Sequence, residues 1–290
     1  MMSIDLHLHT QASDGTLTPK ELLAKAKKYG LMAVSITDHD VIDSLQEGVA
    51  IAANLGLTFI PGVEISASYT ADLSLHILGY GIDPQNPKLR KVLRQNQQAW
   101  EQSEEDSIAA LEKINIKIDR LRYNYWKTHS EMGGWPLFNT LREMGLVSDM
   151  KEYFSKYFGW GQPAYITILF ASPREVISAI KAAGGVPILA HPGLYVEGTT
   201  KLITRASFRQ TLISWGIEGL EAIASGHSAE ETAFLLTYCQ NNNLLVTGGS
   251  DYHGEFAGRS LGVPKVDDAY LQPLLSAIEQ AQQRIIVKHI

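Results

Sequence analysis

The stretch that decides the fold is Ile4–Thr10, "IDLHLHT", in which apolar and polar residues alternate. In an extended strand, successive side chains point to opposite faces. The stretch would therefore turn three apolar side chains to the core and Asp5, His7 and His9 to the other face. Two imidazoles and a carboxylate on one face need a binding partner, and the rest of the sequence indicates what it is.

Strand-like and helix-like stretches alternate before residue 82 and after residue 168. We expect further strands at 31–37, 58–66, 73–81, 186–191, 219–225 and 244–251. We expect helices at 18–30, 42–55, 172–183, 202–214, 229–240 and 268–283. This alternation predicts an α/β fold with a parallel sheet and crossover helices, either a barrel or a doubly wound sheet.

The character of the sequence changes between the two halves. A polar, helix-like run from Lys88 to Leu111 leads into an aromatic-rich stretch without strand alternation. We predict a mainly helical insertion domain at 83–168. The length of this insertion is ordinary for a domain. Residues 1–82 and 169–290 then form one α/β domain around it.

Polar, metal-ligating side chains follow or lie in nearly every expected strand. Seven of the nine histidines and three carboxylates share this placement: His7, His9, Asp14, His39, Glu64, His76, His191, His227, Asp251 and His253. The carboxyl ends of barrel strands meet at one face, where active sites are built. We therefore expect these side chains to gather at one rim.

Bound metal is the expected reason for such a rim. A lone histidine on a strand is usually a structural hydrogen-bonding group. This many imidazoles and carboxylates, however, would repel one another and lose their hydration with no partner to offset the cost. Imidazole with carboxylate, and no thiolate, suits Mn, Fe or Zn and disfavours a lone Ca or Mg site. About nine candidate ligands exceed the needs of one ion, so we predict two or three divalent ions.

Composition excludes several classes of protein. The net charge of −6 argues against a general nucleic-acid or membrane-surface binder. The single cysteine, Cys239, rules out an internal disulfide framework. No apolar run approaches the roughly 20 residues that cross a bilayer. We expect a cytoplasmic protein with no membrane partner and no stable nucleic-acid partner, whose oligomeric state stays open.

The order of motifs resembles the PHP (polymerase and histidinol phosphatase) superfamily. The motifs are Asp-Leu-His-Leu-His, Thr-Asp-His-Asp, Gly-Val-Glu, Ala-His-Pro-Gly and Gly-Ser-Asp-Tyr-His, and the resemblance covers 3–81 and 171–265. The stretch 141–166 also resembles the YciV/TrpH-like subgroup of PHP phosphoesterases. The resemblance implies a distorted (β/α)7 PHP barrel with a metal cluster at the strand ends.

Carried over position by position, the resemblance implies three ion sites. They are His7, His9, Glu64 and Asp251; Glu64, His76 and His191; and Asp14, His39 and His253.

The resemblance also implies supporting roles for four other residues. His227 would touch the leaving group or phosphate, and we expect it, with His253 and Asp251, to be catalytic. Asp5 and Asp40 would orient histidines. Arg259 is a weaker candidate for a contact to the substrate.

One departure from the subgroup concerns the substrate. Relatives often read Gly-Arg-Pro-His where this chain has Gly134-Trp135-Pro136-Leu137. Arginine binds phosphate bidentately, whereas Trp135 can only stack on a ring or pack within the insertion.

The resemblance implies a metal-dependent phosphohydrolase that cleaves a phosphoester of a nucleotide or short oligonucleotide, and metal-activated water suits this reaction. Its partner is then a small phosphorylated substrate. Metal-activated water on a barrel would also serve an amidohydrolase. The same residues would suit a histidinol-phosphatase-like monoesterase or a non-catalytic metal-binding module as well.

Overall fold

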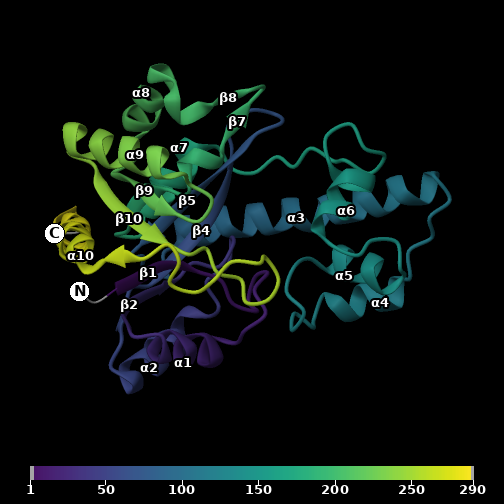
Figure 1. The fold of residues 1–290 in the computed structure, drawn as a ribbon, viewed down its shortest axis with the longest axis horizontal. Helices are drawn as coiled ribbons and strands as arrows, with labels where there is room; N and C mark the ends of the chain where they lie inside the picture. The colour runs from purple at the N-terminus through teal and green to yellow at the C-terminus, as the bar shows by residue number, and fades with distance from the viewer. Residues whose placement is uncertain (1–2, 289–290) are drawn as a thin grey trace.

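The computed structural model describes residues 3–288 and shows a mixed α/β fold (Figure 1). Its strands are β1 (Ser3–Leu8), β2 (Leu31–Ile36), β3 (Thr58–Phe59), β4 (Gly62–Ser68), β5 (Ser74–Tyr80), β6 (Val186–Leu189), β7 (Val196–Glu197), β8 (Thr200–Lys201), β9 (Gly219–Ala224), β10 (Leu245–Gly249) and β11 (Val266–Asp267). The helices that cover the sheets are α1 (Pro19–Lys28), α2 (Leu45–Leu55), α7 (Pro173–Ala182), α8 (Ala206–Trp215), α9 (Ala229–Asn242) and α10 (Leu271–Lys288).

Two sheets form the body of the molecule. One has the order β11-β1-β2-β3 and the other the order β10-β9-β6-β5-β4, while β7 and β8 form a separate hairpin. Single bridges, Leu8 to Tyr252 and His39 to Glu64, link the two sheets at both junctions. The α/β prediction is confirmed, and closure into a seven-stranded barrel stays a prediction.

The expectation of a wholly parallel sheet is wrong at β5. This strand runs antiparallel to both β4 and β6. Only residues 69–73 separate β4 from β5, and so short a link permits a hairpin but not a parallel crossover. The neighbouring pairs β1–β2, β6–β9 and β9–β10 are parallel, as predicted.

The expected strand at 58–66 is in fact two strands in different sheets. β3 pairs with β2, and β4 begins after Pro61 and pairs with β5. Proline has no N–H to donate to a ladder, so it ends the first pairing. The chain therefore changes sheets at Pro61, just before the strand that carries Glu64.

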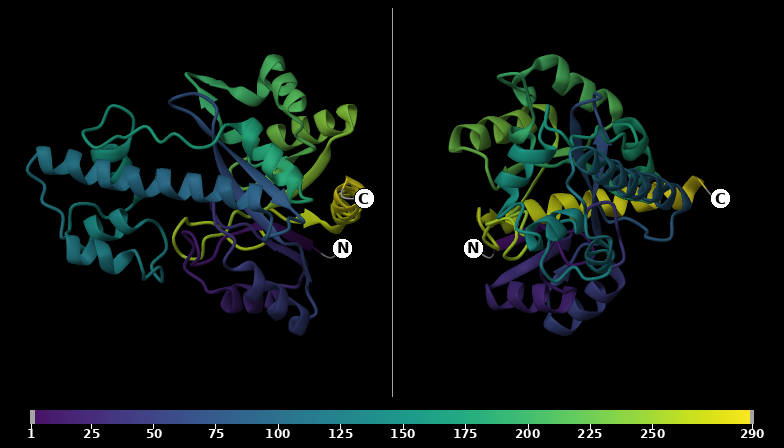
Figure 2. Two further views of the ribbon diagram at one scale, coloured as in Figure 1. Left: turned by 180° about the vertical axis from the view of Figure 1, so that it is seen from behind. Right: turned by 90° about the vertical axis from the view of Figure 1, so that its right-hand side faces the viewer.

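The described chain between β5 and α7 forms helices without strands. These are α3 (Pro87–Lys113), α4 (Arg120–Trp126), α5 (Pro136–Glu143), α6 (Met150–Tyr153) and the π-helical turn η1 (Phe154–Phe158). They project to one side of the sheets in Figures 1 and 2. They also share an apolar core that includes Ile108, Tyr123, Leu137 and Phe138. The division into two domains stays a prediction.

Among the described residues, no helix is long and apolar enough to cross a membrane.

Helix α7 begins with a reciprocal cap. The Ser172 hydroxyl accepts a hydrogen bond from the Glu175 N–H, and the Glu175 carboxylate accepts one from the Ser172 N–H. Such caps satisfy two helix donors that would otherwise lack partners. We expect Ser172→Ala to lower the free energy of unfolding by about 1 kcal/mol, measured by urea denaturation. Ser207→Ala, at an exposed position within α8, is the matched control. An equal loss in both variants would contradict the assigned role of the cap.

Candidate metal-binding active site

The buried carboxylate of Glu64, on β4, is the centre of the predicted rim. Its two oxygens face five imidazoles that come from four segments of the chain, since His7 and His9 share the first. Oε2 lies 3.1 Å from His7 Nε2, 3.4 Å from His9 Nε2 and 3.2 Å from His39 Nδ1; Oε1 lies 3.1 Å from His76 Nδ1 and 3.0 Å from His191 Nε2. The structure therefore brings together the histidines that the sequence predicted would converge.

Two carboxylates extend the cluster on either side of His9. Asp251 Oδ1 lies 3.1 Å from His9 Nε2 and 3.4 Å from His7 Nε2. Asp14 Oδ1 lies 3.3 Å from His253 Nε2 on the other side. All nine predicted ligands thus contribute to one cluster.

Three overlapping groups within this cluster have ligand atoms close enough to share an ion. They are His7, His9, Glu64 and Asp251; His9, Asp14, His39 and His253; and His39, Glu64 and His76. The first group is the same as one predicted set. The third group contains His39 with Glu64 and His76, whereas the predicted set had His191 in place of His39. His9, His39 and Glu64 each belong to two groups, so neighbouring ions would share them.

The buried polar atoms of the cluster fit bound cations. His7 Nε2, both nitrogens of His9, Glu64 Oε2 and Asp251 Oδ1 are buried and make no hydrogen bond within the described chain. An unpartnered buried polar atom costs about 1–3 kcal/mol. These atoms point at one another rather than at protein donors, which is the arrangement that a shared cation would satisfy.

The protein prepares three of the imidazoles, those of His9, His39 and His191, as neutral ligands. Burial, with the neighbouring His253, lowers the pKa of His9 to about 4. Burial also lowers the pKa of His39, to about 3. His7 differs: burial lowers its pKa, but the Glu221 and Glu64 carboxylates outweigh this and raise it to about 10. His7 therefore carries a proton at neutral pH until a cation replaces it.

Backbone strain is concentrated at the rim. Asp40, His191 and Asp251 have φ values of 53°, 27° and 51°, in a region that costs non-glycine residues about 1–3 kcal/mol each. Each follows the end of a strand and turns its chain sharply there. The surrounding contacts thus hold two ligands and one neighbour of a ligand in conformations that an isolated chain would avoid.

The sequence analysis missed two residues that support the cluster. Glu221, buried on β9, lies 2.9 Å from His7 Nδ1 and accepts a 2.7 Å hydrogen bond from the His191 N–H. Asp38, buried after β2, accepts hydrogen bonds from Thr10 and Ser13 and so holds the loop that carries Asp14. A charged residue within an apolar expected strand was the available signal for Glu221.

Asp5 orients the rim through backbone groups. Its carboxylate accepts hydrogen bonds from the N–H groups of His7, Ser250 and Gly262 and from the Ser250 hydroxyl. Ser250 precedes Asp251, so Asp5 joins the ends of β1 and β10. Asp5 thus contacts the backbone of His7, and its role in orienting the histidines stays a prediction.

Asp40 does not orient a histidine ring. Its carboxylate accepts hydrogen bonds from Asn96 Nδ2 (2.7 Å), Trp100 Nε1 (3.2 Å) and the Ser66 N–H (3.2 Å). Asn96 also donates to the Ser66 carbonyl and accepts from the Ala171 N–H. Asp40 therefore ties α3 to the rim, a role that depends on contacts distant in sequence.

His227 has no ring nitrogen free for the predicted catalytic role. Its Nε2 accepts a 3.0 Å hydrogen bond from the Gly193 N–H, and its Nδ1 lies 3.2 Å from the Ala222 carbonyl. A Cβ on Gly193 would lie 2.7 Å from His227 Cδ2, so glycine permits this contact. His227 supports the turn after His191 in this arrangement. Arg259, expected to contact substrate, instead forms an ion pair with the Asp251 carboxylate.

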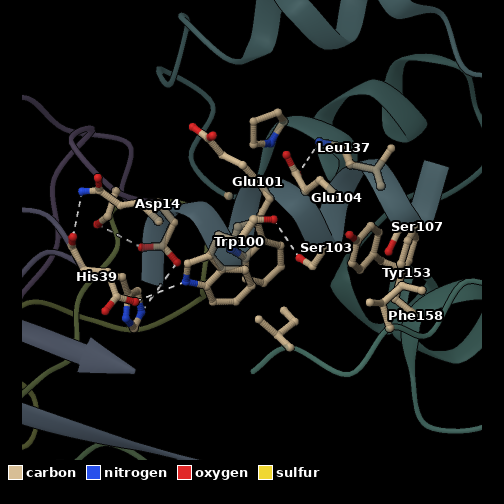
Figure 3. A pocket seen from close by; sticks show the side chains of 18 of the residues that line it. Asp14, His39, Trp100, Glu101, Ser103, Glu104, Ser107, Leu137, Tyr153 and Phe158 are labelled. Carbon is tan, nitrogen blue, oxygen red and sulfur yellow. Dashed lines mark hydrogen bonds and ion pairs between the residues drawn. The ribbon is translucent and has the colours of Figure 1, made fainter. Parts of the chain in front are cut away.

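A cavity of about 510 Å³ opens from the cluster (Figure 3). Asp14 and His39 lie at one end, Leu137, Tyr153 and Phe158 lie at the other, and Trp100 lies between them. Trp135 lines the cavity and also packs on Tyr153, with ring centroids 6.0 Å apart. Both interpretations of Trp135, packing and exposure to a bound ring, are therefore compatible with its position.

Comparison with known proteins identifies the family of this chain. The PHP domain matches residues 5–133. A 3′,5′-nucleoside bisphosphate phosphatase from Chromobacterium violaceum is 34% identical over 265 residues, which cover 90% of this chain and 91% of the relative. The chain belongs to the PHP family. A 5′-3′ exoribonuclease from Haemophilus influenzae is 30% identical, over 86% of this chain and 89% of that protein.

A solved structure agrees with this assignment. A proposed metal-dependent phosphoesterase from Bifidobacterium adolescentis superimposes with a TM-score of 0.85 at 29% identity, covering 95% of this chain and 96% of the other. The predictions of PHP membership and of a hydrolase acting on phosphoester bonds are confirmed.

Glu221 provides a test of how the cluster is supported. We expect Glu221→Gln to weaken metal binding by about 10- to 100-fold, because the buried His7 ring would lose its charged partner. Equilibrium dialysis followed by elemental analysis measures the bound metal. Glu218→Gln, which removes a carboxylate paired with Lys181 outside the cluster, is the matched control. Unchanged affinity in both variants would contradict the role of Glu221.

The raised pKa of His7 predicts proton release on metal binding. At pH 8 the metal-free ring is protonated because its pKa is about 10, and a metal ligand must be deprotonated. His9 and His39 release no proton at this pH, since their pKa values are about 4 and 3. Calorimetry with Mn in buffers of different ionisation enthalpy should show about one proton or more released, because Glu64 also raises the pKa of His76 against the effect of burial. Binding enthalpies that do not depend on the buffer would contradict this assignment.

Proposed function

We propose that this PHP protein is a metal-dependent phosphohydrolase that cleaves a phosphoester of a nucleotide or short oligonucleotide. The observation that carries the proposal is the set of three overlapping ligand groups, from which Asp14, His39 and His76 line one end of a cavity. Two or three divalent ions (Mn, Fe or Zn) fit the neutral imidazoles and carboxylates of these groups.

The nine ligand residues are proposed to hold these ions: His7, His9, Asp14, His39, Glu64, His76, His191, Asp251 and His253. When bound, such ions lower the pKa of water and neutralise the charge of a phosphate group. An acidic protein can therefore bind an anionic substrate here with few basic side chains in the cavity.

The other residues at the rim hold these ligands in position. Glu221 orients the His7 ring, and Arg259 offsets part of the Asp251 charge. The Nδ1 of His253 lies 2.8 Å from the Asp251 carbonyl, which leaves its Nε2 directed at Asp14. Of the two histidines predicted to be catalytic, only His253 thus has a nitrogen directed into the cluster.

The relatives support a nucleotide-like substrate. One is named as a nucleoside bisphosphate phosphatase, one as an exoribonuclease, and a third, from Eggerthella lenta at 24% identity, as a phosphodiesterase of a cyclic phosphoribosyl substrate. All three names describe hydrolysis of an ester between phosphate and a sugar. This shared chemistry favours a sugar phosphate over an amide as the substrate.

We also propose a finer architecture for the chain. The two sheets would act as one distorted (β/α)7 barrel, and residues 83–168 would form a mainly helical insertion. The bridges at Leu8–Tyr252 and His39–Glu64 support the barrel because they lie where the sheets meet. The separate apolar core of the helices supports the insertion.

Two ligand variants test the proposed reaction. We expect His9→Ala and Asp251→Ala each to lower phosphate release by more than about 100-fold, since even residues that only support ligands contribute 10- to 100-fold. The assay measures phosphate released from mononucleotides, nucleoside bisphosphates and short RNA by Mn-loaded protein, with circular dichroism to verify folding. His129→Ala, at an exposed histidine outside the rim, is the matched control. Full Mn loading without phosphate release, or cleavage of amides instead, would overturn the proposal.

A further inference from the structure

The cavity beyond the metal-ligand cluster has a wall made largely of aromatic side chains. We call this set the aromatic wall; it consists of Trp100, Trp135, Tyr153, Phe154 and Phe158. Ile166 and Ile168 add further apolar surface. Stacking on such rings contributes about 1–3 kcal/mol per nucleic-acid base and tolerates any base. This part of the cavity therefore suits an uncharged ring.

The charges beside the aromatic wall are unfavourable for a second phosphate. Among the lining residues that the structure describes, Lys127 is the one lysine or arginine, whereas Glu101 and Glu104 both contribute carboxylates. The charge of Lys127 already acts on Glu104. A phosphate placed here would meet two carboxylates and one offset cation, and like charges at short range repel.

The helix end that could bind an anion is already occupied from within the chain. Helix α5 begins at Pro136, and its first residues line the cavity. Helix N-termini attract anions through their free N–H groups. Here Glu104 Oε1 accepts a 3.0 Å hydrogen bond from the Leu137 N–H, and Glu104 Oε2 accepts one of 3.0 Å from the Tyr123 hydroxyl. The internal carboxylate takes the place that a substrate phosphate would need.

We propose that this cavity selects a nucleoside monophosphate over a nucleoside bisphosphate. The phosphate would lie at the end formed by Asp14 and His39, and the base would lie against the aromatic wall. This inference rests on the proposed function and narrows its substrate class. The preferred substrate would then differ from the one in the name of the bisphosphate phosphatase relative. This difference would come from residues on the helices and not from the metal ligands.

The kinetic test compares substrates that differ by one phosphate. Phosphate release by the Mn-loaded protein is measured for the 3′- and 5′-monophosphates of adenosine and for adenosine 3′,5′-bisphosphate. We expect kcat/KM for the better monophosphate to exceed that for the bisphosphate by about tenfold or more, because of the repulsion from Glu101 and Glu104. An equal or higher value for the bisphosphate would overturn the inference and leave the proposed function standing. No release from any phosphoester would overturn the proposed function, and the inference with it.

A charge reversal shows whether the selectivity resides in the cavity. We expect Glu101→Lys to raise the ratio of bisphosphate to monophosphate kcat/KM by about tenfold. Gln102→Lys adds a cation at the next, exposed position of α3, where it does not line the cavity. This matched control should leave both values unchanged. Equal effects of the two variants would overturn the assignment of selectivity to the cavity wall.

A binding measurement tests the position of the base without catalysis. Adenosine carries no phosphate, so its binding to metal-free protein reports only on contacts to the nucleoside. We expect adenosine to change the tryptophan fluorescence, because Trp100 and Trp135 lie in the wall, whereas ribose should not. Loss of the adenosine response in Trp135→Leu would support the assignment. No response to adenosine in the unmodified protein would overturn it, whatever the outcome of the phosphate assay.

Discussion

The burial of one carboxylate, that of Glu64, is the constraint on which the rest of the structure depends. A buried unpaired carboxylate would cost several kcal/mol. Five imidazoles surround this one, and together, with His7 foremost, they outweigh burial and hold the pKa of Glu64 well below its usual range. The segments that supply these rings lie as far apart in sequence as residues 7 and 191. The fold must bring all of them to within contact of a single side chain.

This requirement accounts for the irregular features of the sheets. The chain leaves the first sheet at Pro61, three residues before Glu64. It then returns along β5, so His76, near the start of that strand, faces the same rim as residues at the ends of parallel strands. At the other junction, Gly249 lies so close to His7 that a Cβ there would overlap the His7 side chain. Local departures from a regular α/β pattern therefore occur where ligands must meet.

The candidate metal ligands could be predicted from the sequence because each leaves a local signal. His7 and His9 alternate with apolar residues, His191 directly follows an apolar run, and Asp251 follows another after the short stretch 247–250. The direction of β5 could not be inferred from its own residues, because a strand reads the same in either direction. The roles of Asp40 and His227 were missed for a related reason. Their partners, Asn96 and Gly193, are 56 and 34 residues away in sequence, so no local pattern shows which nitrogen or oxygen is already engaged.

The hydrogen bonds of Asn96 have a consequence for how the molecule can move. This buried side chain joins α3 to Asp40, to the Ser66 carbonyl and to the Ala171 N–H. Swinging α3 away from the sheets would break all three bonds and strand buried polar groups, at about 1–3 kcal/mol each. The part of α3 around Asn96 is thus held fixed against the sheets. Access to the cavity then depends on movements of the more distant helices, while the candidate metal ligands stay in place.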